Sequence, residues 1–231
     1  MTERTLGATG IGVTPIGLGC WQFSGGEGLS GRYWPALPQE TVNDIVRASL
    51  EGGVRWFDTA EAYGAGRSEA TLATALQAAG RDDGSVVIAT KWLPLLRTAG
   101  SIRRTIDDRL RNLSPYSVDL HQIHIGHGAL ATKKAQLEAM AGLVAAGRIR
   151  AVGVSNFSAR AMRRASQVLA RHGLPLASNQ VRYSLLDRRI ESNGVLAAAK
   201  ELGVTIIAYS PLAQGLLSGK FHDDPERVKQ L

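Results

Sequence analysis

Four polar residues lie where parallel strands are predicted to end, and their types indicate a single reaction. Asp58 and Lys91 close two apolar runs, and His124 closes a third. Tyr63 follows Asp58 by five residues, in a predicted loop. Because the carboxyl ends of parallel strands meet at the edge where ligands bind, we expect these four side chains to share one site.

Together these side chains could transfer a proton to a carbonyl oxygen. A phenol with a pKa of about 10 is a poor proton donor at neutral pH. A neighbouring ammonium stabilises the phenolate and lowers that pKa, while a carboxylate holds the lysine in place. We therefore expect Asp58, Lys91 and Tyr63 to form a tuned general acid, with His124 orienting the substrate oxygen. Hydride must reach the carbon at the same time, and it must come from a cofactor.

The scaffold that positions these residues alternates apolar, β-branched runs with stretches of helical periodicity. Successive strands begin roughly 27–38 residues apart, about the size of one βα unit. Ser101 and Ser158 are the expected N-caps of two helices. The predicted strands are 16–20, 54–58, 86–91, 118–124, 149–154, 177–181 and 204–209. The predicted helices are 41–50, 69–79, 102–113, 136–146, 159–171 and 194–202.

The order of these elements narrows the fold class. Strands that alternate with helices predict a parallel sheet with helices outside it, and residues 4–14 are expected to form a hairpin before the first strand. The strands are apolar on both faces, as a sheet covered on both sides requires. A closed (β/α)8 barrel has eight strands. Seven are predicted here, and an open doubly wound sheet also tolerates seven, so the count alone leaves both architectures open.

Composition favours one domain over residues 1–231, without a membrane or nucleic-acid partner. The chain is 44% hydrophobic and has no linker, no apolar run long enough to cross a bilayer and a single cysteine, so we expect a cytoplasmic protein. The net charge is +7, but the densest arginine groups fall on predicted helices and are interpreted as solvated faces. These groups are Arg103-Arg104 with Arg109 and Arg111, and Arg160 with Arg163-Arg164.

Several ordered motifs extend from the first predicted strands to the end of the chain. They are residues 53–64 (GVRWFDTAEAYG) with Ser68-Glu69, 89–91 (ATK), 118–124 (VDLHQIH), 153–157 (GVSNF), 179–184 (NQVRYS) and 208–215 (AYSPLAQG). With this set the sequence resembles the aldo-keto reductase family. The resemblance implies a (β/α)8 barrel and so favours the barrel over the open sheet.

The resemblance also implies the reaction and its residues. The family carries an Asp–Tyr–Lys–His tetrad, which matches Asp58, Tyr63, Lys91 and His124. It uses NADP(H) to reduce small-molecule aldehydes or ketones to alcohols. The cofactor-contact positions of the family match Gly19, Cys20 and Trp21 at the first-strand turn, Asp58 itself, Ser155, Asn156 and Gln180 at the nicotinamide carboxamide, Tyr209 stacked on the ring, and Ser210, Leu212 and Lys220 beside the pyrophosphate.

Three histidines have a spacing that resembles a metal site, but we expect no metal there. His121, His124 and His127 lie three residues apart. Residues three apart on a strand point to opposite faces, so one ion cannot easily collect them. His121 stands where many family members have tyrosine, and we expect it to face away from His124 with little consequence.

The last part of the chain departs from the resemblance. The eighth strand of the family, with the loop and helix that hold the adenosine 2′-phosphate, has no match here. We therefore expect about seven of eight barrel strands, an NADP preference inherited from the family, and open strand edges through which chains could pair. Two alternatives stay open: a cofactor-binding regulatory or sensor subunit, as the potassium-channel β subunits are, and an inactive truncated product. The residues do not identify the carbonyl substrate.

Overall fold

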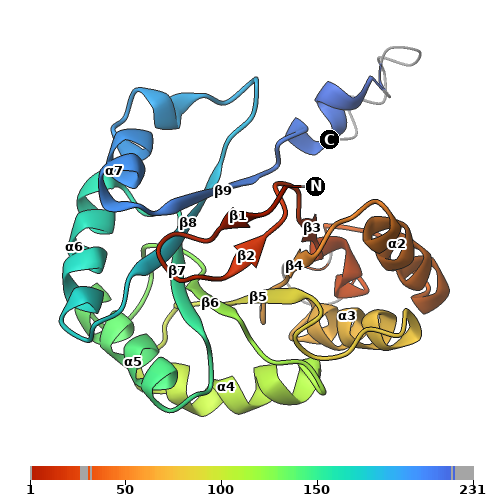
Figure 1. Cartoon of the computed structure of the whole chain (residues 1–231), viewed down its shortest axis with the longest axis horizontal. Coiled ribbons are helices and arrows are strands. Elements are labelled where there is room, and N and C mark those ends of the chain that lie inside the picture. Colours follow the sequence, from red (N-terminus) through yellow and green to blue (C-terminus); the bar gives the residue numbers. More distant parts are fainter. Residues whose placement is uncertain (1, 27–30, 32, 220, 222–231) are drawn as a thin grey trace.

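A parallel sheet, coiled into a nearly closed barrel, forms the centre of the molecule (Figure 1). The computed structural model describes residues 2–26, 31, 33–219 and 221. Within these residues seven strands follow the order of the chain around the sheet, each parallel to the next. They are β3 (Leu18–Gly19), β4 (Trp56–Asp58), β5 (Val87–Trp92), β6 (Leu120–Ile123), β7 (Ala151–Ser155), β8 (Leu176–Arg182) and β9 (Thr205–Tyr209).

Helices connect the successive strands and surround the sheet, which confirms the predicted barrel in place of the open sheet (Figure 1). The described part of the chain contains no helix with both the length and the apolar character needed to cross a membrane. The α-helices are α2 (Gln39–Glu51), α3 (Arg67–Ala78), α4 (Gly100–Leu113), α5 (Lys133–Ala145), α6 (Ala159–Ala170) and α7 (Val195–Leu202). Short 3-10 helices are η1 (Trp21–Ser24), η2 (Arg189–Glu191) and η3 (Ala213–Ser218).

Strand register determines which side chains meet inside the barrel. Lys91 of β5 is paired with Gln122 of β6, which is paired with Gly153 of β7. A Cβ at Gly153 would lie 2.9 Å from the Gln122 side chain and 2.4 Å from the Ser178 hydroxyl. Glycine is therefore required here, because it leaves the interior space through which Gln122 extends.

The two predicted helix caps have different outcomes. The Ser158 hydroxyl accepts a hydrogen bond from the Ala161 amide and caps α6, as predicted. The prediction for Ser101 was wrong, since α4 begins at Gly100, two residues before the predicted start, and Ser101 lies inside its first turn. Its hydroxyl accepts from the Trp92 indole at 3.1 Å, so a contact with the sheet replaces the cap.

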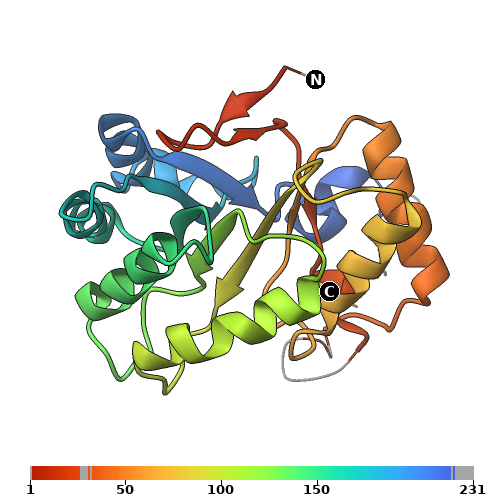
Figure 2. The same cartoon turned by 60° about the horizontal axis from the view of Figure 1, so that its bottom comes forward.

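The predicted N-terminal hairpin closes the amino-terminal end of the barrel. Strands β1 (Arg4–Thr5) and β2 (Gly12–Val13) are antiparallel, and Figure 2 shows them across one end of the sheet. The Gly7 amide donates to the Thr205 hydroxyl at 2.7 Å and so ties the hairpin to β9. A small apolar core lies beneath the hairpin and is made of Leu6, Ile11, Val13, Trp56, Ala89, Leu120, Ala151, Ala177 and Ile207.

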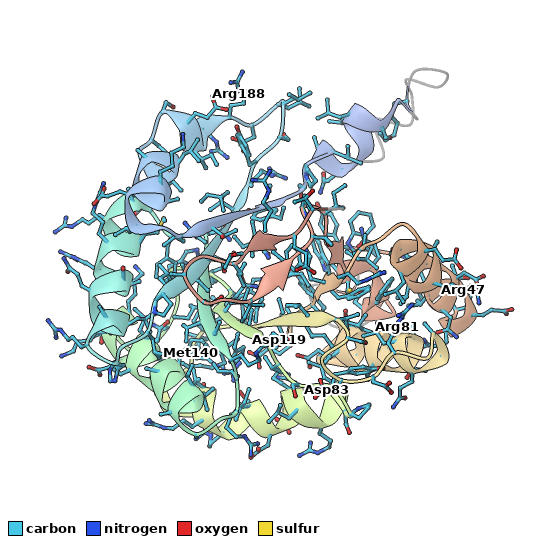
Figure 3. All side chains as sticks on the ribbon, in the orientation of Figure 1. Arg47, Arg81, Asp83, Asp119, Met140 and Arg188 are labelled. Atoms are coloured by element: carbon cyan, nitrogen blue, oxygen red, sulfur yellow. The ribbon has the colours of Figure 1, made fainter. Side chains whose placement is uncertain are left out.

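The main core lies between the sheet and the helices, while most arginines project into solvent. In Figure 3, Met140 of α5 lies in the inner layer, whereas Arg47 and Arg188 are at the periphery. The arginine groups interpreted as solvated faces are exposed except at Arg109, where the interpretation was wrong. Arg109 is 6% exposed because it shares the buried stripe of α4, which also contains Ile102, Ile106 and Leu113.

Candidate active site

Three of the four predicted chemical side chains meet at one ammonium. Lys91 is fully buried, and its Nζ donates to Asp58 Oδ2 at 2.5 Å and to the Thr59 carbonyl at 2.8 Å. The same Nζ lies 3.4 Å from the Tyr63 hydroxyl. Asp58 ends β4, Lys91 is on β5 and Tyr63 lies in the loop after β4, so adjacent parallel strands bring the three together.

Burial changes the expected electrostatics of Tyr63. Its pKa is raised, because burial disfavours the phenolate more than Lys91 favours it, and Asp58 adds to the rise. The expected net lowering of this pKa was therefore wrong, although Lys91 does act in that direction. Burial also disfavours the ammonium of Lys91, but Asp58 and Tyr63 outweigh it and raise the pKa of Lys91. At neutral pH the pair is a phenol beside an ammonium.

Two glutamines complete the surroundings of Asp58. Gln122 Nε2 and Gln180 Nε2 donate to Asp58 Oδ1 at 3.1 Å and 3.0 Å, so both carboxylate oxygens have donors. Gln122 was missed in the sequence. Its position two residues before His124 was a usable signal, since residues two apart on a strand share a face. Gln180, which is predicted to contact a carboxamide, donates to Asp58 in this structure.

The fourth residue, His124, lies directly after β6 beside the proton donor. Its ring meets the Tyr63 ring edge-on, with centroids 5.6 Å apart. Burial, with a smaller contribution from Lys91, lowers the pKa of His124 to about 3. The imidazole is therefore neutral at physiological pH and has one N–H to donate to a ligand in the cavity.

His121 faces away from this site. It is 1% exposed, and burial with the nearby Arg109 and Arg97 lowers its pKa to about 3. Neither ring nitrogen has a hydrogen-bond partner among the described residues. The described residues also contain no cluster of three His, Cys, Asp or Glu side chains that could bind a metal ion.

Replacing His121 with phenylalanine should reduce the sensitivity of the fold to acid. The unfolded chain binds a proton at His121 below pH of about 6.5, whereas the folded chain does so only near 3. Stability is therefore lost as pH falls between these values. From pH 7 to pH 5 this histidine costs about 2 kcal/mol, and His121→Phe should remove that loss.

Urea unfolding at pH 7 and at pH 5 gives the change in the free energy of unfolding between the two pH values. The packing of the new ring contributes equally at both pH values, so it does not affect this change. The exposed His172 provides the matched control, as His172→Phe. An equal pH dependence in His121→Phe and the unmodified chain would show that His121 is not held neutral.

A row of polar groups lies at the carboxyl ends of β7 and β9. The Ser155 hydroxyl donates to the Gln180 carbonyl at 2.9 Å, and Asn156 Nδ2 donates to the Ser155 hydroxyl at 3.0 Å. The Tyr209 hydroxyl donates to Asn156 Oδ1 at 3.1 Å. Amide and hydroxyl groups both donate and accept hydrogen bonds, as a carboxamide does. This donor set therefore fits the carboxamide of a nicotinamide cofactor.

The turn after β3 supplies an aromatic wall. Trp21 stacks on the Tyr63 ring with centroids 5.8 Å apart, and on Tyr33 with centroids 5.4 Å apart. Cys20 is fully buried, and burial raises the pKa of its thiol far above the usual value. The thiol therefore stays protonated and acts as a packing group.

Most predicted site residues face one open cavity of about 2290 Å³. The cavity also extends to the N-terminal hairpin, where Leu6 and Val13 line it, so its volume exceeds that of the candidate site alone. Lys91 lies behind the wall, and Lys220 lies outside the described residues. The predicted residues that line the cavity are Gly19, Cys20, Trp21, Asp58, Tyr63, His124, Ser155, Asn156, Gln180, Tyr209, Ser210 and Leu212.

Comparison with known proteins identifies one protein family over nearly the whole chain. The model of the aldo/keto reductase family matches residues 15–230. Aldo-keto reductase YhdN of Bacillus subtilis is 34% identical over 232 residues, which cover 97% of this chain and 66% of that protein. The uncharacterized oxidoreductase Mb2320 of Mycobacterium bovis is 39% identical over 220 residues, which cover 94% of this chain and 64% of that protein.

The structure of the thermostable aldo-keto reductase Tm1743, in complex with the inhibitor epalrestat, is also similar. It has a TM-score of 0.81 and 31% identity, and the match covers 100% of this chain and 80% of that one. The chain spans about two thirds of the length of the curated relatives that it matches. The barrel, the arrangement of its site and these matches lead to one conclusion: the chain belongs to the aldo/keto reductase family.

Proposed function

We propose that this oxidoreductase-family chain uses NADP(H) to reduce aldehydes or ketones to alcohols, with Tyr63 as the proton donor. The observation that carries the proposal is the Lys91 ammonium, which contacts both Asp58 and the Tyr63 hydroxyl behind the cavity wall. A buried ammonium beside a phenol is an arrangement that prepares the phenol to lose its proton.

Each of the four residues has a defined part in this reaction. Tyr63 donates its phenolic proton to the carbonyl oxygen, and Lys91 stabilises the phenolate that remains. Asp58 keeps Lys91 charged and in place. His124, neutral because its pKa is about 3, donates a hydrogen bond that orients the carbonyl oxygen. Reduction requires the protonated phenol, so its rate should fall as pH rises through the raised pKa of Tyr63.

The cofactor would lie along the carboxyl ends of β7, β8 and β9. When bound, the nicotinamide supplies the hydride that reduces the carbonyl carbon. Ser155, Asn156 and Gln180 would hold its carboxamide, and Tyr209 would stack on its ring. Gln180 would then exchange its hydrogen bond with Asp58 for one with the carboxamide. The preference for NADP(H) over NAD(H) rests on the family.

A carbonyl panel with NADPH tests the proposal. Oxidation of NADPH is followed by absorbance for aliphatic and aromatic aldehydes and ketones, while a parallel titration measures the Kd for NADPH. The same panel with NADH tests the cofactor preference. Turnover supports the proposed enzyme. Tight binding with no turnover across the panel would favour a sensor subunit, and neither binding nor turnover would show that the chain is inactive.

A further inference from the structure

The loop that carries Tyr63 has a backbone conformation that needs outside support. Residues 59–66 join β4 to α3, and the three residues after Tyr63 all have positive φ. The values are 64° at Gly64, 54° at Ala65 and 94° at Gly66. This region is disfavoured for alanine, and such a conformation persists only where the surrounding structure holds it.

Two buried carboxylates, one on each side of Tyr63, anchor this loop. Glu61 lies two residues before Tyr63, and its Oε1 accepts a hydrogen bond from the Leu93 amide at 2.6 Å. Glu69 lies six residues after Tyr63, in the first turn of α3, and accepts from the Thr90 hydroxyl at 2.6 Å. Both anchors therefore bind β5 or the residue that follows it.

The guanidinium of Arg109 joins the two carboxylates. Its Nη1 lies 2.6 Å from Glu61 Oε2, and its Nε lies 2.7 Å from Glu69 Oε2. A Cβ at Gly66 would lie 2.3 Å from Asn112 Nδ2 and 3.2 Å from Arg109 Nη2, so glycine in the loop leaves room for both side chains. The planar fork of arginine suits this bridge, whereas the single ammonium of lysine does not.

The positive and negative charges in this network balance, but a gain in stability does not by itself explain why the network is buried. Arg97 also pairs with Glu61, which gives two guanidinium groups and two carboxylates. Burial raises the pKa of Glu69, and Arg109 opposes this rise. A buried ion network commonly adds little net stability compared with apolar packing, but it can select one conformation.

We propose that Arg109 is a positioning residue for the proton donor: by binding Glu61 and Glu69, it holds the Tyr63 hydroxyl beside Lys91. This inference rests on the proposed function, since it takes Tyr63 as the acid. Arg109 acts through the loop and not on the substrate. Its effect on the reaction should therefore depend on the presence of the Tyr63 hydroxyl.

A double-mutant cycle tests this dependence. Arg109→Lys keeps the positive charge but loses the bridge, and it should lower kcat about 10–100-fold, as displacement of a reacting group by about 1 Å does. The Kd for NADPH should stay unchanged. In a Tyr63→Phe background the same substitution should have little effect on the residual rate, because its effect passes through the missing hydroxyl.

Titration of the Tyr63 phenol provides a readout that needs no turnover. Tyrosinate absorbance of the chain, minus that of Tyr63→Phe, follows this one phenol. In Arg109→Lys its titration should shift from that of the unmodified chain, because the position of the phenol sets both its burial and its contact with the Lys91 ammonium. If the unmodified chain shows no turnover, the proposed function fails, while this titration still decides the positioning role.

Two further variants keep the test decisive. Arg163→Lys is the matched control, since Arg163 makes a similar two-point contact with Glu201 on the exposed surface. Glu61→Gln keeps the shape of the anchor and replaces Arg109→Lys if that variant does not fold. An unshifted titration in a folded variant would overturn the proposal. Equal losses of kcat in the Tyr63 and Tyr63→Phe backgrounds would also do so, since they indicate a merely structural role.

Discussion

Tyr63→Phe should lower kcat for carbonyl reduction by about 10²–10⁴-fold, the usual contribution of general acid catalysis. The substitution removes the hydroxyl that lies 3.4 Å from the Lys91 ammonium. The ring remains, with its stacking on Trp21 and its edge contact with His124. The Kd for NADPH and the thermal midpoint should therefore change little, so the loss should appear in kcat.

Steady-state kinetics with the best substrate of the panel measures this effect. Tyr116→Phe is the matched control, because Tyr116 is a buried tyrosine that also loses one hydrogen bond, to the Arg81 carbonyl. Tyr116 precedes β6 and lies away from the cavity. Turnover near that of the unmodified chain in Tyr63→Phe would remove Tyr63 from the role of acid.

Lys91→Met should suppress turnover on the order of 10²-fold or more and move the pH profile upward. Lys91 lowers the pKa of Tyr63, both through its charge and through its hydrogen bond. Without it, burial and Asp58 act unopposed, so the pKa of Tyr63 rises further. The phenol then gives up its proton less readily during reduction, while the descending limb of the profile moves to higher pH.

The pH dependence of kcat checks the direction of this shift. An unshifted profile with full activity in Lys91→Met would show that another group tunes the phenol. Circular dichroism confirms that each variant is folded before its kinetics are interpreted.

The sequence by itself determined the βα alternation, the hairpin, the cap at Ser158 and the positions of the four chemical residues. These features depend on short-range rules: strand and helix periodicity, capping chemistry and the common edge at which parallel strands end. The polar residues at the ends of β4, β5 and β6 could therefore be placed near one another before any contact was known.

The tertiary structure decided the features that depend on contacts between distant segments. The helical position of Arg109 suggests a solvated arginine, and only the carboxylates of the preceding βα unit explain its burial. The Ser101 hydroxyl likewise accepts a hydrogen bond from the distant Trp92 indole and does not cap the helix. The direction of the pKa shift of Tyr63 depends on the balance between burial and the field of Lys91. Burial is a property of the packed barrel as a whole, so residue types and spacing could identify the proton donor but not the sign of its pKa shift.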